Sequence, residues 1–118
     1  MGNTVLVVED DPTLLSMLAF ALRASGHTPL LKSDAVTTLE ELPDEAPDVI
    51  LCDVHLPGMN GAEITQLLRS APLLADTPVI LISDDDEPFE HTADTLVTKP
   101  FGPMEVVELV EELASRNQ

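Results

Sequence analysis

The sequence predicts a doubly wound α/β domain built on a five-stranded parallel sheet. Short apolar runs alternate with segments of helical periodicity, and the apolar runs lack the polar alternation of a half-exposed strand. Most of these runs also end on a polar or charged residue. At 118 residues with 44% hydrophobic residues, the chain can bury one core and is neither a disordered tail nor a coiled coil. We expect residues 1–118 to be one domain.

The strands are predicted from runs rich in β-branched residues and leucine. Strands buried on both faces need helices on both sides of the sheet, and crossovers between parallel strands are right-handed. A flavodoxin-like arrangement, with the strand order 2-1-3-4-5, is therefore the leading candidate. The five predicted strands are Thr4–Val8, Thr28–Leu31, Val49–Asp53, Pro78–Ser83 and Leu96–Thr98.

Helix signals fill the intervals. Asp11 followed by Pro12 predicts an N-cap and a first helical residue, with the helix reaching about Ser25 and Gly26 closing it. The other predicted helices begin at Ser33 or Asp34 and run through Leu42, follow Gly61 through Leu68, and open at Gly102-Pro103 with Glu105, Glu108, Glu111 and Glu112 facing water; residues 71–77 are a predicted loop.

Composition excludes several classes of function. Five basic residues against 22 acidic ones give a net charge of -17, which repels phosphate backbones, so we expect no direct nucleic-acid binding. Cys52 is the only cysteine, which rules out an internal disulfide, and it should simply pack. No apolar run is long enough to span a bilayer and no signal peptide begins the chain, so we expect a soluble cytoplasmic protein without membrane insertion. His27 and His91 are expected at the surface.

The candidate site consists of polar residues at strand ends. A single strand-end Asp53 would more often start a turn than do chemistry. Glu9 and Asp10, however, end the first strand, Ser83 the fourth and Lys99 the fifth, and the carboxyl ends of parallel strands share one edge of the sheet. Three clustered carboxylates require a neutralising cation, and hard oxygen ligands favour Mg²⁺. A carboxylate nucleophile, a metal, an ammonium and a hydroxyl donor are together equipped for phosphoryl transfer.

These residues carry a family resemblance. The sequence resembles a receiver domain of two-component response regulators in Val5–Asp11, in Asp53–Gly61 with its Leu-Pro-Gly turn, in Ile82-Ser83 and in Thr98–Phe101. The resemblance implies that Asp53 is the phosphoacceptor, that Asp10 binds Mg²⁺ directly, that Glu9 does so largely through water, and that the main-chain carbonyl of His55 is a further ligand. It also implies that Ser83 is the switch hydroxyl, that Lys99 contacts the phosphoryl group, and that the Lys99-Pro100 peptide is a cis candidate.

The chain departs from the family pattern at three places. Fifteen residues separate Ser83 from Lys99, about six fewer than usual, which is more than one helical turn. The fourth helix of the family is therefore expected to be short or missing, and the usual dimer through helix 4, strand 5 and helix 5 is in doubt. Leu96 stands where the family has an aromatic that responds to the switch hydroxyl, so the usual coupling should be weakened. Asp84 stands where a small residue is usual and could repel a phosphodonor.

Three functional hypotheses follow. In the first, the chain is a stand-alone receiver that takes a phosphoryl group from a histidine kinase or phosphotransfer protein and signals to a downstream protein by contact, since no effector domain follows Gln118. It would be a phosphoacceptor with at most slow self-catalysed turnover rather than an enzyme. In the second, it is a pseudo-receiver that works without phosphorylation. The third, an aspartate-nucleophile phosphatase, is disfavoured because Val54 and His55 supply no second acid.

Overall fold

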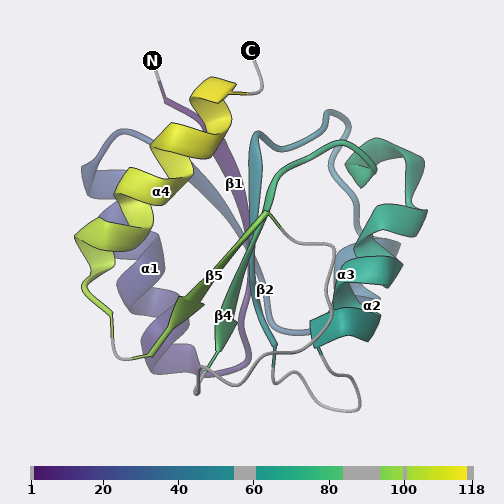
Figure 1. Cartoon of the computed structure of the whole chain (residues 1–118), viewed down its shortest axis with the longest axis horizontal. Helices are drawn as coiled ribbons and strands as arrows, with labels where there is room; N and C mark the ends of the chain where they lie inside the picture. The colour runs from purple at the N-terminus through teal and green to yellow at the C-terminus, as the bar shows by residue number, and fades with distance from the viewer. Residues whose placement is uncertain (1, 55–60, 84–93, 100, 117–118) are drawn as a thin grey trace.

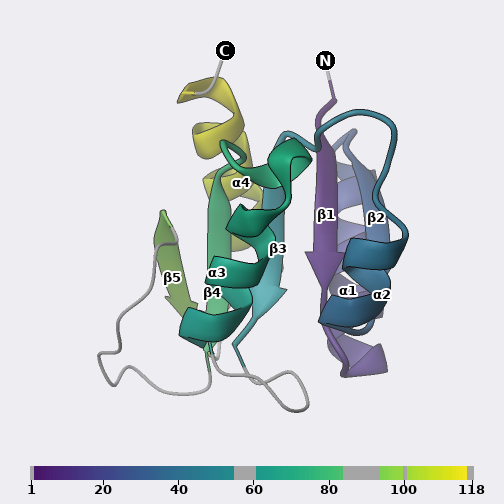
Figure 2. The same cartoon turned by 90° about the vertical axis from the view of Figure 1, so that its right-hand side faces the viewer.

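All five predicted strands pair into one parallel sheet. The computed structural model describes residues 2–54, 61–83, 94–99 and 101–116. The strand order is β2-β1-β3-β4-β5, and every neighbouring pair is parallel, as predicted. In Figure 2 the arrowheads of β1 and β3 point to the same lower edge. The strands are β1 Thr4–Val8, β2 Thr28–Lys32, β3 Val49–Asp53, β4 Val79–Ser83 and β5 Thr95–Thr98.

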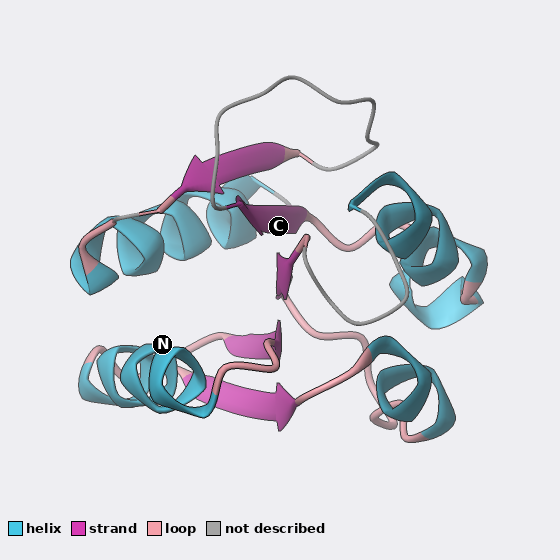
Figure 3. Ribbon diagram, turned by 90° about the horizontal axis from the view of Figure 1, so that it is seen from below, coloured by secondary structure: helices cyan, strands magenta, loops and turns pink. Residues whose placement is uncertain are grey.

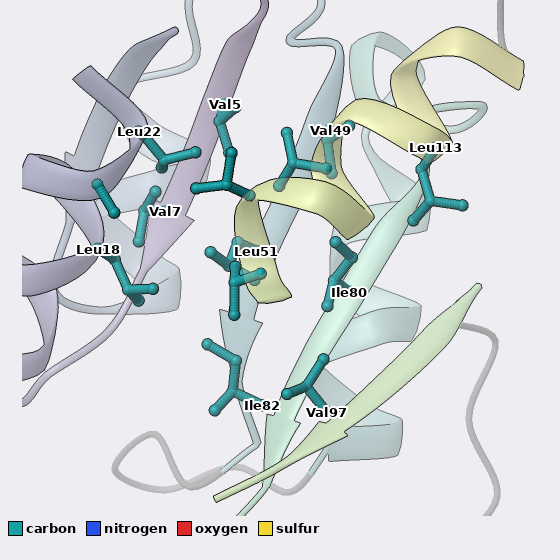
Figure 4. Close-up of a cluster of buried hydrophobic side chains, with 14 of the residues drawn as sticks. Val5, Val7, Leu18, Leu22, Val49, Leu51, Ile80, Ile82, Val97 and Leu113 are labelled. Atoms are coloured by element: carbon teal, nitrogen blue, oxygen red, sulfur yellow. The ribbon is translucent and has the colours of Figure 1, made fainter. Parts of the chain in front are cut away.

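Helices cover both faces of this sheet (Figures 1 and 3). Alternate strand residues point to opposite faces, so the apolar strands feed two separate cores. One core joins the sheet to α1 and α4, and Figure 4 shows Leu18 and Leu22 of α1 beside Val5 and Val7 of β1. The other core joins the sheet to α3 and the 3₁₀ helix η1. The helices are α1 Pro12–Ala24, α2 Ala35–Glu40, α3 Gly61–Ser70, η1 Pro72–Leu74 and α4 Pro103–Arg116.

The start of α1 follows the predicted capping pattern. Asp11 is the N-cap, and its carboxylate accepts the Thr13 N–H at 3.0 Å. Pro12 is the first helical residue, and Gly26 closes the helix with φ of 89°, a conformation that glycine adopts without a Cβ clash. Because this cap begins two residues after Glu9, it fixes the main chain that leaves β1 at the carboxyl edge of the sheet.

Two boundaries differ from the prediction. The helix α2 ends at Glu40 rather than reaching Leu42, and Glu41 leaves the helical region with φ of -121° and ψ of 50°. The following Leu42-Pro43 pair explains the early end, since the residue before proline disfavours helical dihedrals. The predicted loop at 71–77 contains η1, which places the buried Leu74 in the second core.

His27 is buried, so its predicted place at the surface is wrong. Its ring is only 3% exposed, Nδ1 accepts the Asn3 N–H at 3.0 Å, and Nε2 lies 2.9 Å from a carboxylate oxygen of Glu111. Glu111 remains half exposed, but it is paired rather than purely solvated. No local sequence pattern signals this contact, because it joins residues 84 positions apart.

Some predictions fall outside the described residues. They concern the short or missing helix between β4 and β5, the cis candidate at Pro100 and the surface position of His91. Within the described ranges, no helix has the length and hydrophobicity needed to cross a membrane.

Candidate functional site

Three carboxylates meet at the carboxyl edge of the sheet. Glu9 and Asp10 directly follow β1, and Asp53 ends β3, the strand that pairs with β1. One oxygen from each of the three side chains lies within 4.8 Å of the others. Glu9 and Asp53 are only 1% and 3% exposed, whereas Asp10 is exposed. The cluster thus has a buried floor and one side open to solvent.

Glu9 is a buried carboxyl group that is only partly satisfied by hydrogen bonds. Its Oε1 accepts the Asp11 N–H at 3.2 Å, but its buried Oε2 has no hydrogen-bond partner among the described residues. Burial, a hydrogen bond with Asp53 and the charge of Asp53 raise the pKa of Glu9 to about 8. A carboxyl group held in this way is protonated near neutral pH unless a cation replaces the proton.

The donor set fits a divalent cation of the Mg²⁺ type. All three candidate ligands offer hard carboxylate oxygens, and the unsatisfied Oε2 of Glu9 is a buried acceptor for which the described residues provide no donor. The exposed Asp10 leaves room for the waters that Mg²⁺ retains. The predicted ligand at the His55 carbonyl lies outside the described residues. Glu9, Asp10 and Asp53 therefore offer the oxygen ligands that the predicted Mg²⁺ site requires.

Lys99 brings a cation to the same edge. Its Nζ lies 3.5 Å from Oδ2 of Asp53, and its side chain is about a quarter exposed. The Lys99 main-chain N–H donates to the Ser83 carbonyl at 2.7 Å, which extends the pairing of β5 with β4 by one residue. The ammonium is thus positioned by the sheet itself, and its charge can neutralise oxygens that gather at Asp53.

Ser83 occupies the end of β4 and is 1% exposed. Its strand neighbours are β3, where Asp53 pairs with Ile82, and β5, where Thr98 pairs with Ser83. Asp53, Ser83 and Lys99 therefore stand at the carboxyl ends of three adjacent strands, β3, β4 and β5. Asp84, which follows Ser83, lies outside the described residues.

Cys52 packs in the core as the sequence predicted, and Leu96 of β5 lies against the same core. Cys52 is fully buried in the second core, where burial raises the pKa of its thiol, so it is an inert packing residue. Leu96 is half-buried on β5 and packs against the same core. A leucine at this position has no polar atom that would favour its rotation between the core and solvent.

A cavity beside Lys99 was not apparent from the sequence. It has a volume of about 340 Å³ and lies between α1 and the segment that follows β5. The exposed Thr13 and Met17 of α1 form one side, and Phe101 forms another. Thr13 and Met17 are four residues apart and therefore lie on one face of α1, so the sequence could have indicated this wall of the cavity. The lining residues are Asp11, Thr13, Leu14, Met17, Lys99 and Phe101.

Comparisons with known proteins agree with this architecture. The family model of the response regulator receiver domain matches residues 5–111. The chain is 32% identical over 124 aligned residues to the alkaline phosphatase synthesis transcriptional regulatory protein PhoP of Bacillus subtilis, covering 100% of this chain and 51% of that protein. It is 33% identical to the DNA-binding response regulator MtrA of Mycolicibacterium smegmatis, covering 100% and 53%. The chain thus spans about half the length of these curated relatives.

A solved structure gives the same result at the level of the fold. The BeF₃-activated receiver domain of DrrB, a Thermotoga maritima protein, superposes with a TM-score of 0.82 at 28% identity, covering 98% of this chain and 99% of that one.

Proposed function

Because the chain belongs to the response regulator receiver domains, we propose that it is a phosphorylation switch whose phosphoacceptor is Asp53. The observation that supports this proposal most strongly is the single group formed by Glu9, Asp10 and Asp53 with the Lys99 ammonium 3.5 Å from Asp53. The proposed donor is the phosphohistidine of a histidine kinase or of a phosphotransfer protein.

The proposed reaction transfers one phosphoryl group to a carboxylate. An Asp53 carboxylate oxygen attacks phosphorus, a P–O bond forms as the P–N bond of the donor phosphohistidine breaks, and the imidazole leaves with a proton. Lys99 neutralises the phosphoryl oxygens and Ser83 donates its hydroxyl hydrogen to one of them. Glu9 and Asp10, with Asp53 and the His55 carbonyl, would hold Mg²⁺, which supplies charge neutralisation of the transferring group when bound.

The signal would leave through β4 and β5. A phosphoryl group on Asp53 adds negative charge beside Ser83 and Lys99, which end adjacent strands, so both residues must reorganise around it. We propose that a separate downstream protein reads the changed surface by contact. Because Leu96 packs in the core and lacks a polar edge, this output does not depend on an aromatic side chain of β5.

The test distinguishes this proposal from the two alternatives. The parent protein and Asp53→Asn are incubated with Mg²⁺ and acetyl phosphate, and their intact masses are measured. One phosphoryl group on the parent and none on Asp53→Asn supports the switch. No mass change in the parent contradicts it and favours a pseudo-receiver that binds its partners without phosphorylation. Continuous release of phosphate from phosphate esters contradicts it in favour of a phosphatase.

A further inference from the structure

A cavity lies at the amino end of the sheet, opposite the edge that carries the receiver site. It has a volume of about 310 Å³, which is within the range of small-molecule sites. Its walls come from the loop before β3, from η1 and the turn that follows it, and from the last turn of α4. Asp48 of the wall directly precedes β3 and Asp53 ends that strand, so the two places are roughly 16 Å apart along β3. The amino end of the sheet is the upper edge in Figure 2.

The wall of this cavity is acidic. Asp48 and Asp76 contribute two carboxylates, and none of the described residues that line the cavity is basic. Ala114 of the wall lies in the last turn of α4, and the C-terminal end of a helix carries partial negative charge. Arg116 of the same turn is paired with Glu112. The electrostatic potential of the cavity therefore favours a cationic ligand.

The main chain of the wall has few hydrogen-bond donors to offer. Two of the lining residues are prolines, which have no N–H. The Asp48 N–H donates to the Thr4 carbonyl at 2.8 Å, and Oδ2 of Asp48 accepts the Thr4 N–H at 2.7 Å. The Thr77 N–H donates to the Leu74 carbonyl at 3.2 Å. Anions need donors, so a wall rich in acceptors requires a ligand that brings its own N–H or O–H groups.

Thr77 is a buried residue of the wall whose hydroxyl has no hydrogen-bond partner among the described residues. The residue is only 3% exposed, and its carbonyl accepts from the Arg69 guanidinium. Because its N–H and carbonyl are both engaged, the hydroxyl is the polar group that Thr77 offers to the cavity. A buried hydroxyl without a partner costs free energy, which a ligand that bonds to it would offset.

We propose that this cavity binds a short aliphatic diamine. The two ammonium groups neutralise Asp48 and Asp76, and the Thr77 hydroxyl accepts one of their N–H groups. The methylene chain lies against the apolar part of the wall, which includes Pro47 and Leu73 and which a metal ion would leave uncovered. Ion pairs that are open to water are weak, so the dissociation constant is on the order of 1 mM.

Titration of the ¹⁵N-labelled protein with putrescine, a four-carbon diamine, tests the proposal by NMR. The buffer contains excess Mg²⁺, which competes for the carboxylates of the receiver site, and about 0.1 M NaCl, which screens diffuse attraction. The amide signals of Asp48, Leu73, Thr77 and Ala114 should shift together along one saturating curve. Shifts that grow across the acidic surface without saturation, or that leave these four amides unchanged, overturn the proposal.

Variants separate a defined site from attraction to overall charge. Thr77→Val keeps the charge and should weaken binding about fivefold without lowering the melting temperature, because the lost hydroxyl has no partner among the described residues. The exposed Asp76 should likewise lose about fivefold in affinity on change to Asn. Glu108→Gln is the matched control, since it removes one exposed charge from α4 outside the cavity. Parent affinity in Thr77→Val, or equal losses in Asp76→Asn and Glu108→Gln, overturns the proposal.

The class of ligand has its own test. The four-carbon diol and the four-carbon dicarboxylate succinate should leave the four amide signals unchanged at about 10 mM, because the diol lacks charge and succinate is repelled. Mg²⁺ added without putrescine should not move these signals either. Saturating shifts with the diol would overturn the diamine in favour of a polyol, and such shifts with Mg²⁺ would overturn it in favour of a metal ion.

This proposal does not rest on the proposed function. Asp53→Asn should bind putrescine with the affinity of the parent, because Asp53 is at the other end of β3. Loss of binding in Asp53→Asn would show that the amine occupies the receiver site and would overturn the cavity as its place. Failure of Asp53 to accept a phosphoryl group leaves the outcome of the titration unchanged.

Discussion

The protonation of Glu9 depends on its burial beside Asp53. The carboxyl group is buried beside Asp53, and its Oε2 lacks a partner among the described residues, so the metal-free protein retains a proton there near neutral pH. The pKa is raised because burial and the nearby Asp53 destabilise the charged form of Glu9, an effect that a bound cation would oppose. The sequence placed Glu9 at the site, but the pKa depends on burial by the fold and could not be inferred from residue order.

The first prediction concerns pH and stability without metal. Because folding raises the pKa of Glu9 from 4.5 to about 8, the folded state binds this proton more tightly than the unfolded state. Its stabilising contribution is complete below pH 4.5 and is lost as the pH rises toward 8. The unfolding free energy of the parent should therefore fall across this range by a few kcal/mol more than that of Glu9→Gln, as measured by urea unfolding in EDTA. Equal slopes in the two proteins would contradict the assignment.

Lys99 gives a prediction that separates catalysis from metal binding. Its ammonium lies near Asp53, whereas the candidate metal ligands come from β1 and β3 and the segments that follow them. Lys99→Ala should slow phosphorylation about a hundredfold, the usual effect of removing one charge-stabilising group. Mg²⁺ affinity, measured by calorimetry, should not fall. Lys32→Ala, which removes another ion-paired lysine on β2, is the control, and an equal loss in both variants would argue against a role for Lys99.

At the scale of elements, the sequence predicted what depends on local patterns. The Asp11-Pro12 start of α1, the five strands and the acids that follow them could be predicted because capping and apolar runs are properties of neighbouring residues. Contacts between distant segments could not. The burial of His27 and the pairing of Arg69 with Asp94 join residues 84 and 25 positions apart.

Asp94 anchors the start of β5. Its Oδ2 accepts the Val79 N–H at 2.8 Å and lies 3.1 Å from the Arg69 guanidinium, and its own N–H donates to the Val79 carbonyl at 2.9 Å. This carboxylate therefore joins α3, β4 and β5 at the amino end of the sheet. The pairing register that ends with Thr98 opposite Ser83 begins beside it.

The contacts of the Asp94 side chain give a prediction about stability. Asp94→Ala should lower the unfolding free energy by about 1–2 kcal/mol, because the Val79 N–H loses its acceptor and Arg69 loses a partner. Glu112→Ala removes an exposed ion pair within α4 and should change it by less than about 0.5 kcal/mol. Urea unfolding of both variants measures the difference. Similar values would show that Asp94 is no more than a surface ion.

At the scale of the whole molecule, charge is the dominant feature. A net charge of -17 on 118 residues produces strong self-repulsion, and most of the described carboxylates outside the site are exposed. The two cores contain no charged residues, so the repulsion acts between groups outside them. The acidic field attracts divalent cations to the molecule, and the carboxylates of Glu9, Asp10 and Asp53, which lie within 4.8 Å of one another, are the proposed site for one.

Screening this repulsion should stabilise the fold. Raising NaCl from 0.05 to 0.5 M should increase the melting temperature in EDTA by a few °C, because the Debye length falls below the spacing of many surface charges. Circular dichroism at several salt concentrations measures this change. Choline chloride should act equally, since the effect does not require a specific cation. A melting temperature that falls with salt would show that attractive ion pairs outweigh the repulsion.

The proposed switch depends on one acidic group, Glu9, Asp10 and Asp53, that would hold a divalent ion and present Asp53 to a phosphodonor. The most direct measurement is phosphorylation by acetyl phosphate in Mg²⁺ and in EDTA, with the modified residue located by peptide mapping after borohydride reduction. We predict one phosphoryl group per chain, on Asp53, in Mg²⁺ and a negligible amount in EDTA. Modification of another residue, or equal incorporation without the metal, would contradict the account.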